Sequence, residues 1–160
     1  MVEQLFTWLE ESSLAQHIGE SFWFPLLESI HVIAVTFVVG AVLMVDLRLL
    51  GAAAKRYPVT GMTRELTMWS WLAFLLSVIT GIGLFITRAN HYAENPAFQI
   101  KFLLLACAGI NMAAFHFGIW RRVASWDNGK TPRAAKVAGF LSLTVWCGVL
   151  LAGRWVGHLS

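Results

Sequence analysis

The chain has 160 residues, of which 58% are hydrophobic and only 13% are charged; its mean hydropathy is +0.65 and its formal net charge is +3. This composition excludes a soluble domain that hides an apolar core behind a polar shell, and it indicates an integral membrane protein. The length allows four membrane-spanning helices with short connections and leaves no room for a separate soluble domain.

Several other classes of protein are not expected. The positive charges are confined to particular loops, so they do not indicate a partner nucleic acid. Cys107 and Cys147 lie in apolar runs without CxxC spacing, which favours neither a disulfide framework nor a thiolate metal site. There is no set of nucleophile, base and orienting residue and no glycine-rich phosphate loop, so hydrolysis and group transfer are not expected. An enzymatic role, if there is one, would be that of an oxidoreductase component.

The first segment, residues 1–21, carries glutamates and no lysine or arginine. It therefore lacks the basic start of a secretory signal. Val2, Leu5, Phe6 and Leu9 recur at helical spacing, which predicts a short amphipathic helix in the membrane interface. Because this segment is acidic, we expect it on the outer side.

Four apolar runs follow the first segment, and each is long enough to cross a bilayer. We expect the spans at about 22–50, 66–88, 97–120 and 137–156. The expected fold is therefore all-α: an integral membrane four-helix bundle with a short N-terminal interfacial helix, in a single transmembrane domain over 1–160.

Local signals support these boundaries. Pro25 fits the opening turn of the first span, and Gly51 marks its end. Asn95-Pro96 is typical of an N-cap followed by proline at the first helical position. Thr131-Pro132 repeats this signature before the fourth span.

Basic residues predict the orientation. Of the twelve lysines and arginines, nine lie in or beside the first and third connections: Arg48, Lys55, Arg56, Arg64, Arg121, Arg122, Lys130, Arg133 and Lys136. Because such residues favour the cytoplasmic side, both connections should be cytoplasmic. Both termini are then expected on the outer, periplasmic side of the membrane.

An outer group of polar residues surrounds His31. At a rise of 1.5 Å per residue, His31 lies roughly 9 Å below Pro25, the outer start of the first span. The expected partners at the outer ends of the other spans are Arg88, His91, Lys101, Arg154 and His158. A histidine inside a lipid-spanning helix is costly, so it points to a function.

An inner group surrounds His116, which lies about 28 Å down the third span from Ala97. Asp46, Arg48, Asn111 and Met112 are expected at this level. Given this separation in depth, His31 and His116 should not share one metal ion.

The outer group could hold haem b between helices, because neutral imidazoles bind haem iron and basic side chains pair with its propionates. The axial ligands would be His31 with His91 or His158. Arg88, Lys101 and Arg154 would be the propionate partners. An inner haem on His116 is a further possibility, although no second histidine lies at its level.

Other uses of these residues stay open. Met112 and His116, four residues apart, could offer copper a thioether and an imidazole. Glu28 and His31 have the spacing of carboxylate metal sites, but no second such motif is present.

Purely structural roles are also open. Asp46 could pair with Arg48, or either of them with His116, and Glu28 could pair with Arg154 or Lys101. His31 could simply make a hydrogen bond between helices. Ser77 and Gly81, and likewise Gly153 and Gly157, form small-residue faces that allow close helix contact.

Four strings carry a resemblance: ESIHVIAVTFVVGAVLMVDLRLLG, TGIGLF, NPAFQIKFLLLACAGINMAAFH and AGRW. Over nearly the whole chain it resembles a family of small, uncharacterised four-span bacterial inner-membrane proteins, with DLRLLG and NPAFxxK as the most specific strings. More distantly, its architecture is similar to copper-resistance D-type proteins and membrane cytochromes b, which implies haem or copper as cofactor. The residues that match the family pattern are His31, Asp46, Arg48, Lys101, Asn111, His116 and Arg154, whereas His91 and His158 fall outside it.

The sequence thus leads us to expect a haem b protein of the bacterial cytoplasmic membrane with a cytochrome b-like role in electron transfer. Its partners beyond the lipid bilayer would be quinone, a redox protein or a second copy of the chain. The alternatives are a transporter for copper, protons or another metal ion, and a non-catalytic subunit of a membrane complex.

Overall fold

The computed structural model describes residues 1–54, 56–127 and 129–158. Lys55, counted above among the basic residues of the first connection, lies outside the described residues. Four helical runs are long and apolar enough to cross a membrane: Trp23–Leu50, Val59–Ile86, Pro96–Ser125 and Arg133–Val156. The expected all-α bundle of four membrane helices is confirmed.

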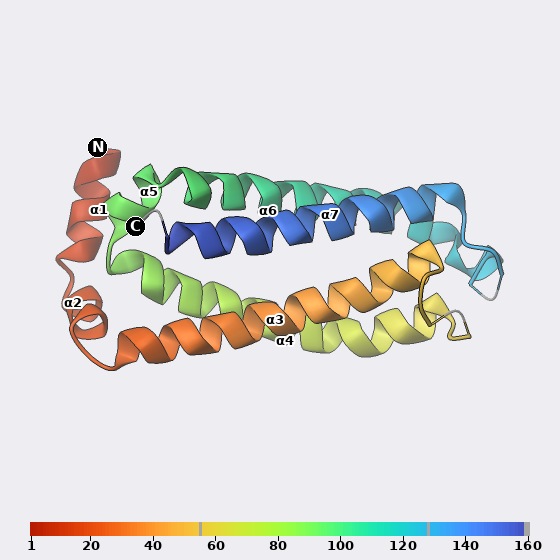
Figure 1. Cartoon of the computed structure of the whole chain (residues 1–160), viewed down its shortest axis with the longest axis horizontal. Helices are drawn as coiled ribbons and strands as arrows, with labels where there is room; N and C mark the ends of the chain where they lie inside the picture. The colour runs from red at the N-terminus through yellow and green to blue at the C-terminus, as the bar shows by residue number, and fades with distance from the viewer. Residues whose placement is uncertain (55, 128, 159–160) are drawn as a thin grey trace.

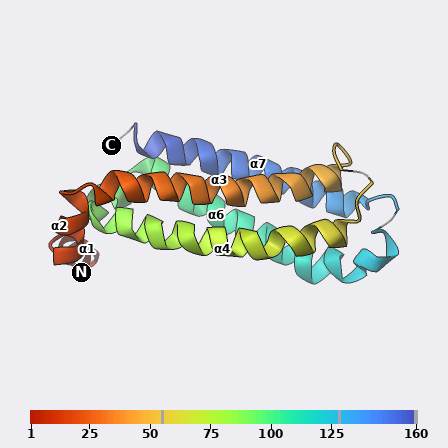
Figure 2. The ribbon, with the colours of Figure 1, turned by 90° about the horizontal axis from the view of Figure 1, so that it is seen from below.

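The four spans form two antiparallel hairpins (Figure 1). Helices α3 (Trp23–Leu50) and α4 (Val59–Ile86) make one hairpin, and α6 (Pro96–Ala114) and α7 (Arg133–Val156) make the other. The hairpins meet chiefly where α3 packs on α7, as the view in Figure 2 also shows.

The two ends of the bundle differ. Three short helices, α1 (Val2–Glu10), α2 (Ser13–Gly19) and α5 (Ala89–Glu94), lie at the end that also holds both termini (Figure 1). We call this the capped end. The other end carries the α3–α4 connection and the connection into α7, where the basic residues gather. We call it the basic end.

The spans are longer than the apolar runs alone indicate. Helix α4 begins at Val59 rather than at 66, because its first two turns are polar and project beyond the apolar run. The third span does not stop at 120. It continues from α6 through a π-helical turn, η1 (Phe115–Ile119), and a 3₁₀ segment, η2 (Trp120–Ser125). Such local changes of helix type keep the chain helical while shifting its register.

Three of the four boundary signals act as expected, and Pro25 lies in the first turn of α3. Gly51 ends α3 in a left-handed conformation with φ of 75°, a region that glycine enters without steric cost. Asn95 caps α6 by accepting hydrogen bonds from the backbone N–H groups of Ala97 and Phe98, at 2.9 and 3.4 Å. By contrast, Thr131 does not cap α7; its hydroxyl instead lies 3.5 Å from a guanidinium nitrogen of Arg48.

Arg48 holds the basic end together and does not pair with Asp46. Its guanidinium donates to the carbonyl of Tyr57 at 2.7 Å and to that of Asp127 at 3.3 Å, and it is 5% exposed. The expected Asp46–Arg48 pair is therefore wrong. Two residues apart on a helix, the side chains point in different directions, and Arg48 instead reaches the carbonyls of the two connections at this end.

Asp127 completes this contact at the N-terminus of α4. Its carboxylate accepts hydrogen bonds from the backbone N–H of Thr60, at 3.0 Å, and from the Thr60 hydroxyl. A carboxylate from a distant loop thus takes the place of an N-cap side chain, since Pro58 offers none. Burial alone would raise the pKa of Asp127, but the hydrogen bonds from Thr60 and Val59 and the nearby charge of Arg48 lower it.

The capped end is closed by aromatic side chains. Phe85 at the end of α4 stacks on Phe98 of α6 with ring centroids 5.5 Å apart, and Phe6 of α1 meets Phe85 edge-on at 5.7 Å. Glu10 of α1 accepts a 2.8 Å hydrogen bond from the backbone N–H of Asn90. The first segment is two helices rather than one, because Ser12 caps α2 through the backbone N–H of Ala15.

We expect Asp127→Ala to lower the free energy of unfolding by about 1–3 kcal/mol, because the buried donors of Thr60 lose their acceptor. Denaturation in detergent, followed by circular dichroism, measures this change. Because its pKa is depressed in the folded protein, the carboxylate's contribution is present above the usual value of 3.8 and is lost as the pH falls through the lower folded value. The difference in free energy of unfolding between the native chain and the Asp127→Asn variant should therefore become smaller as the pH falls. A difference that grows as the pH falls would contradict the role of the Asp127 carboxylate as the acceptor for Thr60.

Candidate functional site

His31 lies on α3 and reaches across to α4. Its Nδ1 atom is 2.9 Å from the backbone carbonyl oxygen of Ser77 and 3.1 Å from the hydroxyl oxygen of Thr80. The Thr80 hydroxyl donates its own proton to the carbonyl of Leu76, at 2.8 Å, so its oxygen is free to accept. Both partners of Nδ1 therefore act as acceptors.

This arrangement fixes the form of the imidazole. A carbonyl oxygen can only accept, so Nδ1 carries the proton and Nε2 keeps its lone pair. Among the described residues, Nε2 has no hydrogen-bond partner. A histidine whose Nδ1–H is held by a backbone carbonyl is in the state in which histidines bind metals through Nε2.

Gly81 makes room for the ring. A Cβ atom at Gly81 would lie 3.1 Å from Cε1 and 3.5 Å from Nδ1 of His31. Ser77, one turn away, is 8% exposed. The Ser77 and Gly81 face is thus occupied by α3 of the same chain and is not free for a partner helix.

Lys101 faces this imidazole from the other hairpin. It lies in α6, and its charge acts on His31 across the space between the hairpins. Its aliphatic stem packs on Gly153 of α7, where a Cβ atom would be 3.9 Å from Cδ, Cε and Nζ. The Lys101 ammonium is largely removed from water, and it has no carboxylate partner among the described residues. The pair expected with Glu28 is thus not formed, and Glu28 is exposed.

The other residues predicted for the outer group lie at the capped end and are not assembled around His31. The side chains of Arg88, His91, Arg154 and His158 are exposed. The ring of His91 meets Tyr92 edge-on at 6.0 Å, and that of His158 meets Trp155 at 5.7 Å. Both histidines are thus associated with neighbours in their own segments.

Tyr92 is a polar group of the capped end that the sequence did not single out. Burial raises its pKa, the charge of Arg88 lowers it and the charge of Glu28 raises it. Its ring stacks on Phe98 with centroids 5.8 Å apart. The side chains of α3, α4, α5 and α6 are thus within reach of one another here.

The residues predicted for the inner group are dispersed. His116 lies in the π-helical turn and stacks on Trp120, with centroids 6.0 Å apart and planes at 11°. Met112 is 54% exposed on α6. Asn111 donates from Nδ2 to the carbonyl of Ala138, at 3.1 Å, and so ties α6 to α7. Within the described ranges, no three or more His, Cys, Asp or Glu side chains come together as a metal site.

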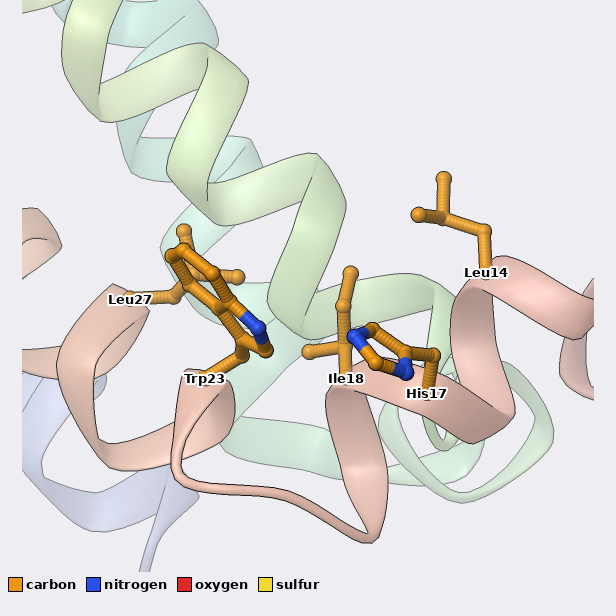
Figure 3. A pocket seen from close by; sticks show the side chains of 5 residues that line it. All are labelled: Leu14, His17, Ile18, Trp23 and Leu27. Carbon is orange, nitrogen blue, oxygen red and sulfur yellow. The ribbon is translucent and has the colours of Figure 1, made fainter.

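The surface hollows are apolar. One of about 300 Å³ lies between α2 and the start of α3; its lining residues are Leu14, His17, Ile18, Trp23 and Leu27 (Figure 3). Another, of about 600 Å³, lies along α4 beside Trp71 and Leu75. Neither contains the polar groups of a catalytic site, and both are suited to contact with lipid chains.

The sequence identified His31 and Lys101 but not the residues that hold them. Ser77 and Gly81 were noted only as a small-residue pair, and Thr80 was not noted. The available signal was their place in an apolar span opposite a histidine, since Ser77, Thr80 and Gly81 share one face of a helix.

The comparisons with known proteins give a family and nothing more specific. A family model described as "Family of unknown function (DUF6644)" matches residues 5–159. No curated protein and no solved structure matches the chain.

We expect Gly81→Leu to destabilise the bundle by about 1–3 kcal/mol, because the new side chain must displace the His31 imidazole. Gly109→Leu is the matched control, since nothing lies within 4 Å of a Cβ atom there. Reversible unfolding in mixed micelles measures both. Equal stability of the two variants would contradict the packing of His31 on Gly81.

Proposed function

We propose that this chain, which belongs to the family of unknown function DUF6644, binds haem b in the membrane through His31 and serves in electron transfer. The observation that carries the proposal is the state of the imidazole: Nδ1–H is committed to the Ser77 carbonyl, and the Nε2 lone pair is free. Haem would supply a one-electron iron centre that histidine nitrogen can bind.

The chain's own residues fit such a group in two respects. Ser77, Thr80 and Gly81 hold the His31 ring in one orientation, so little rotamer freedom is lost on binding. Lys101 supplies a positive charge on the opposite hairpin, and no carboxylate among the described residues neutralises it. An ammonium in a site of low dielectric pairs well with a propionate.

The geometry favours a single histidine ligand, His31, from one copy of the chain. His91 and His158 lie at the capped end beside their own aromatic neighbours, so we no longer assign either of them as the partner of His31. His31 would then be the residue of this chain that holds the iron.

A quinone headgroup is the second candidate for this position. The free Nε2 would accept a hydrogen bond from a hydroquinone hydroxyl, and Lys101 would donate to a quinone oxygen. One imidazole and one ammonium on opposite hairpins suit such a ring. Quinone would then be the electron donor or acceptor of the haem, or would replace the haem as the ligand.

We propose a position in the bacterial cytoplasmic membrane with the basic end inside. The capped end and both termini would then face the periplasm. In this orientation His31 lies in the outer half of the membrane, where a redox protein partner could approach only from the periplasmic side.

We expect the protein purified in mild detergent to show a Soret band that shifts on reduction with dithionite, and His31→Ala to abolish it, because the variant lacks the nitrogen that binds iron. His17→Ala, outside the spans, is the control and should keep the full spectrum. A full spectrum in His31→Ala would overturn the assignment of the ligand. If the native protein, supplied with haem, shows no band, the haem proposal itself is wrong.

Lys101→Ala should weaken haem affinity about tenfold, the loss expected when one charge-assisted pair of about 1.4 kcal/mol is removed. Lys101→Arg keeps the charge and should lose less. Titration of the apoprotein with haem, followed by absorbance, gives both dissociation constants. Unchanged affinity in Lys101→Ala would show that the ammonium does not contact the ligand.

A further inference from the structure

A second buried polar position lies away from His31, in the half of the bundle next to the basic end. Asp46 of α3 is 5% exposed, and its Oδ2 atom has no hydrogen-bond partner. Thr63 of α4 likewise has a buried hydroxyl oxygen without a partner. These are the two such side-chain atoms in the described part of the chain, and a buried polar atom without a partner calls for a physical explanation.

Both residues lie at the same depth. Asp46 comes four residues before the end of α3 at Leu50, and Thr63 comes four residues after the start of α4 at Val59. At 1.5 Å per residue, each is about 6 Å inside the basic end of its helix. Because α3 and α4 are antiparallel neighbours, the two unsatisfied oxygens belong to one layer of the bundle.

Helix α7 closes this layer from the other side. A Cβ atom at Gly139 would lie 3.2 Å from the Cβ of Leu49 and 3.4 Å from the backbone oxygen of Asp46, so the two helices are in close contact there. Ser142, on the next turn of α7, is the polar side chain that faces the Asp46 carboxyl. A side chain that is 5% exposed within an apolar span has almost no contact with bulk water.

Positive charge does not reach Asp46 from any of the surrounding helices. On its own helix, Arg48 is committed to the carbonyls of Tyr57 and Asp127. On α4 Arg64 is exposed, and on α7 the group that faces the carboxyl is Ser142, with Lys136 exposed. An ionised carboxylate without a counter-ion is too costly in hydrocarbon, whereas a neutral acid is tolerated.

We propose that Asp46 is a proton-binding site inside the membrane, held as the neutral acid between α3 and α7 and able to exchange its proton with water from the basic end. As an acid, the carboxyl has one O–H donor, for which the hydroxyl oxygen of Ser142 is an acceptor. Release gives one proton and one carboxylate, and uptake reverses this. The site is independent of His31 and of any haem.

Infrared spectroscopy of the full chain in lipid tests this directly. We expect the carbonyl stretch of a protonated carboxylic acid at neutral pH, whereas Asp127, whose pKa is lowered by the hydrogen bonds from Thr60, is ionised there. The band should be lost in Asp46→Asn, which has the same shape and no acid group. It should remain in Asp127→Asn, the matched control, and it should move to a new frequency in Asp46→Glu.

Exchange is tested on the same samples in heavy water. The Asp46 band should shift to lower frequency as O–H becomes O–D. No acid band at neutral pH overturns the proposal, because Asp46 is then ionised. A band that is lost in Asp46→Asn but does not shift in heavy water also overturns it, because the acid is then a sealed structural group. A band that survives in Asp46→Asn assigns the proton to another residue.

Discussion

The hydrogen bond from His31 to the Ser77 carbonyl is the contact on which the proposed site depends. Ser77 carries a backbone carbonyl that already belongs to α4, and Thr80 adds a second acceptor at 3.1 Å. Gly81 allows the ring to approach close enough to use them. In hydrocarbon a polar group must find a partner within the protein, so this single contact both fixes the α3–α4 hairpin and orients the ring.

The same constraint distinguishes the other polar groups. Arg48 at the basic end satisfies three oxygens from two connections, and so it acts as a structural residue. The stem of Lys101 packs on Gly153, and its charge has no carboxylate partner in the described part of the chain. Asp46 has one carboxyl oxygen without a partner. Satisfied groups maintain the fold, whereas unsatisfied groups are where a ligand or a proton can act.

The sequence was sufficient for the class of fold because hydropathy, proline and glycine act locally. Four apolar runs, the Asn95 cap and Gly51 need no knowledge of distant contacts. Hydropathy alone does not give the start of α4, because its first turns are polar and are held by Asp127, far along the chain. Likewise, the Thr131-Pro132 signature predicts a cap, whereas the structure places the Thr131 hydroxyl on Arg48. At the site, His31 and Lys101 were evident as costly groups in apolar runs, whereas their partners depend on how the two hairpins pack.

The division into two hairpins bears on how the protein is made. The His31 contact with Ser77 lies wholly within α3 and α4, and the Asn111 contact with Ala138 wholly within α6 and α7. Each pair can therefore leave the translocation machinery with its own interhelical hydrogen bond already formed. Joining the pairs then relies on Arg48 and Asp127, which lie at the water-facing end. Biogenesis can thus proceed in two steps, with His31 and Lys101 brought together only after the second half has been synthesised.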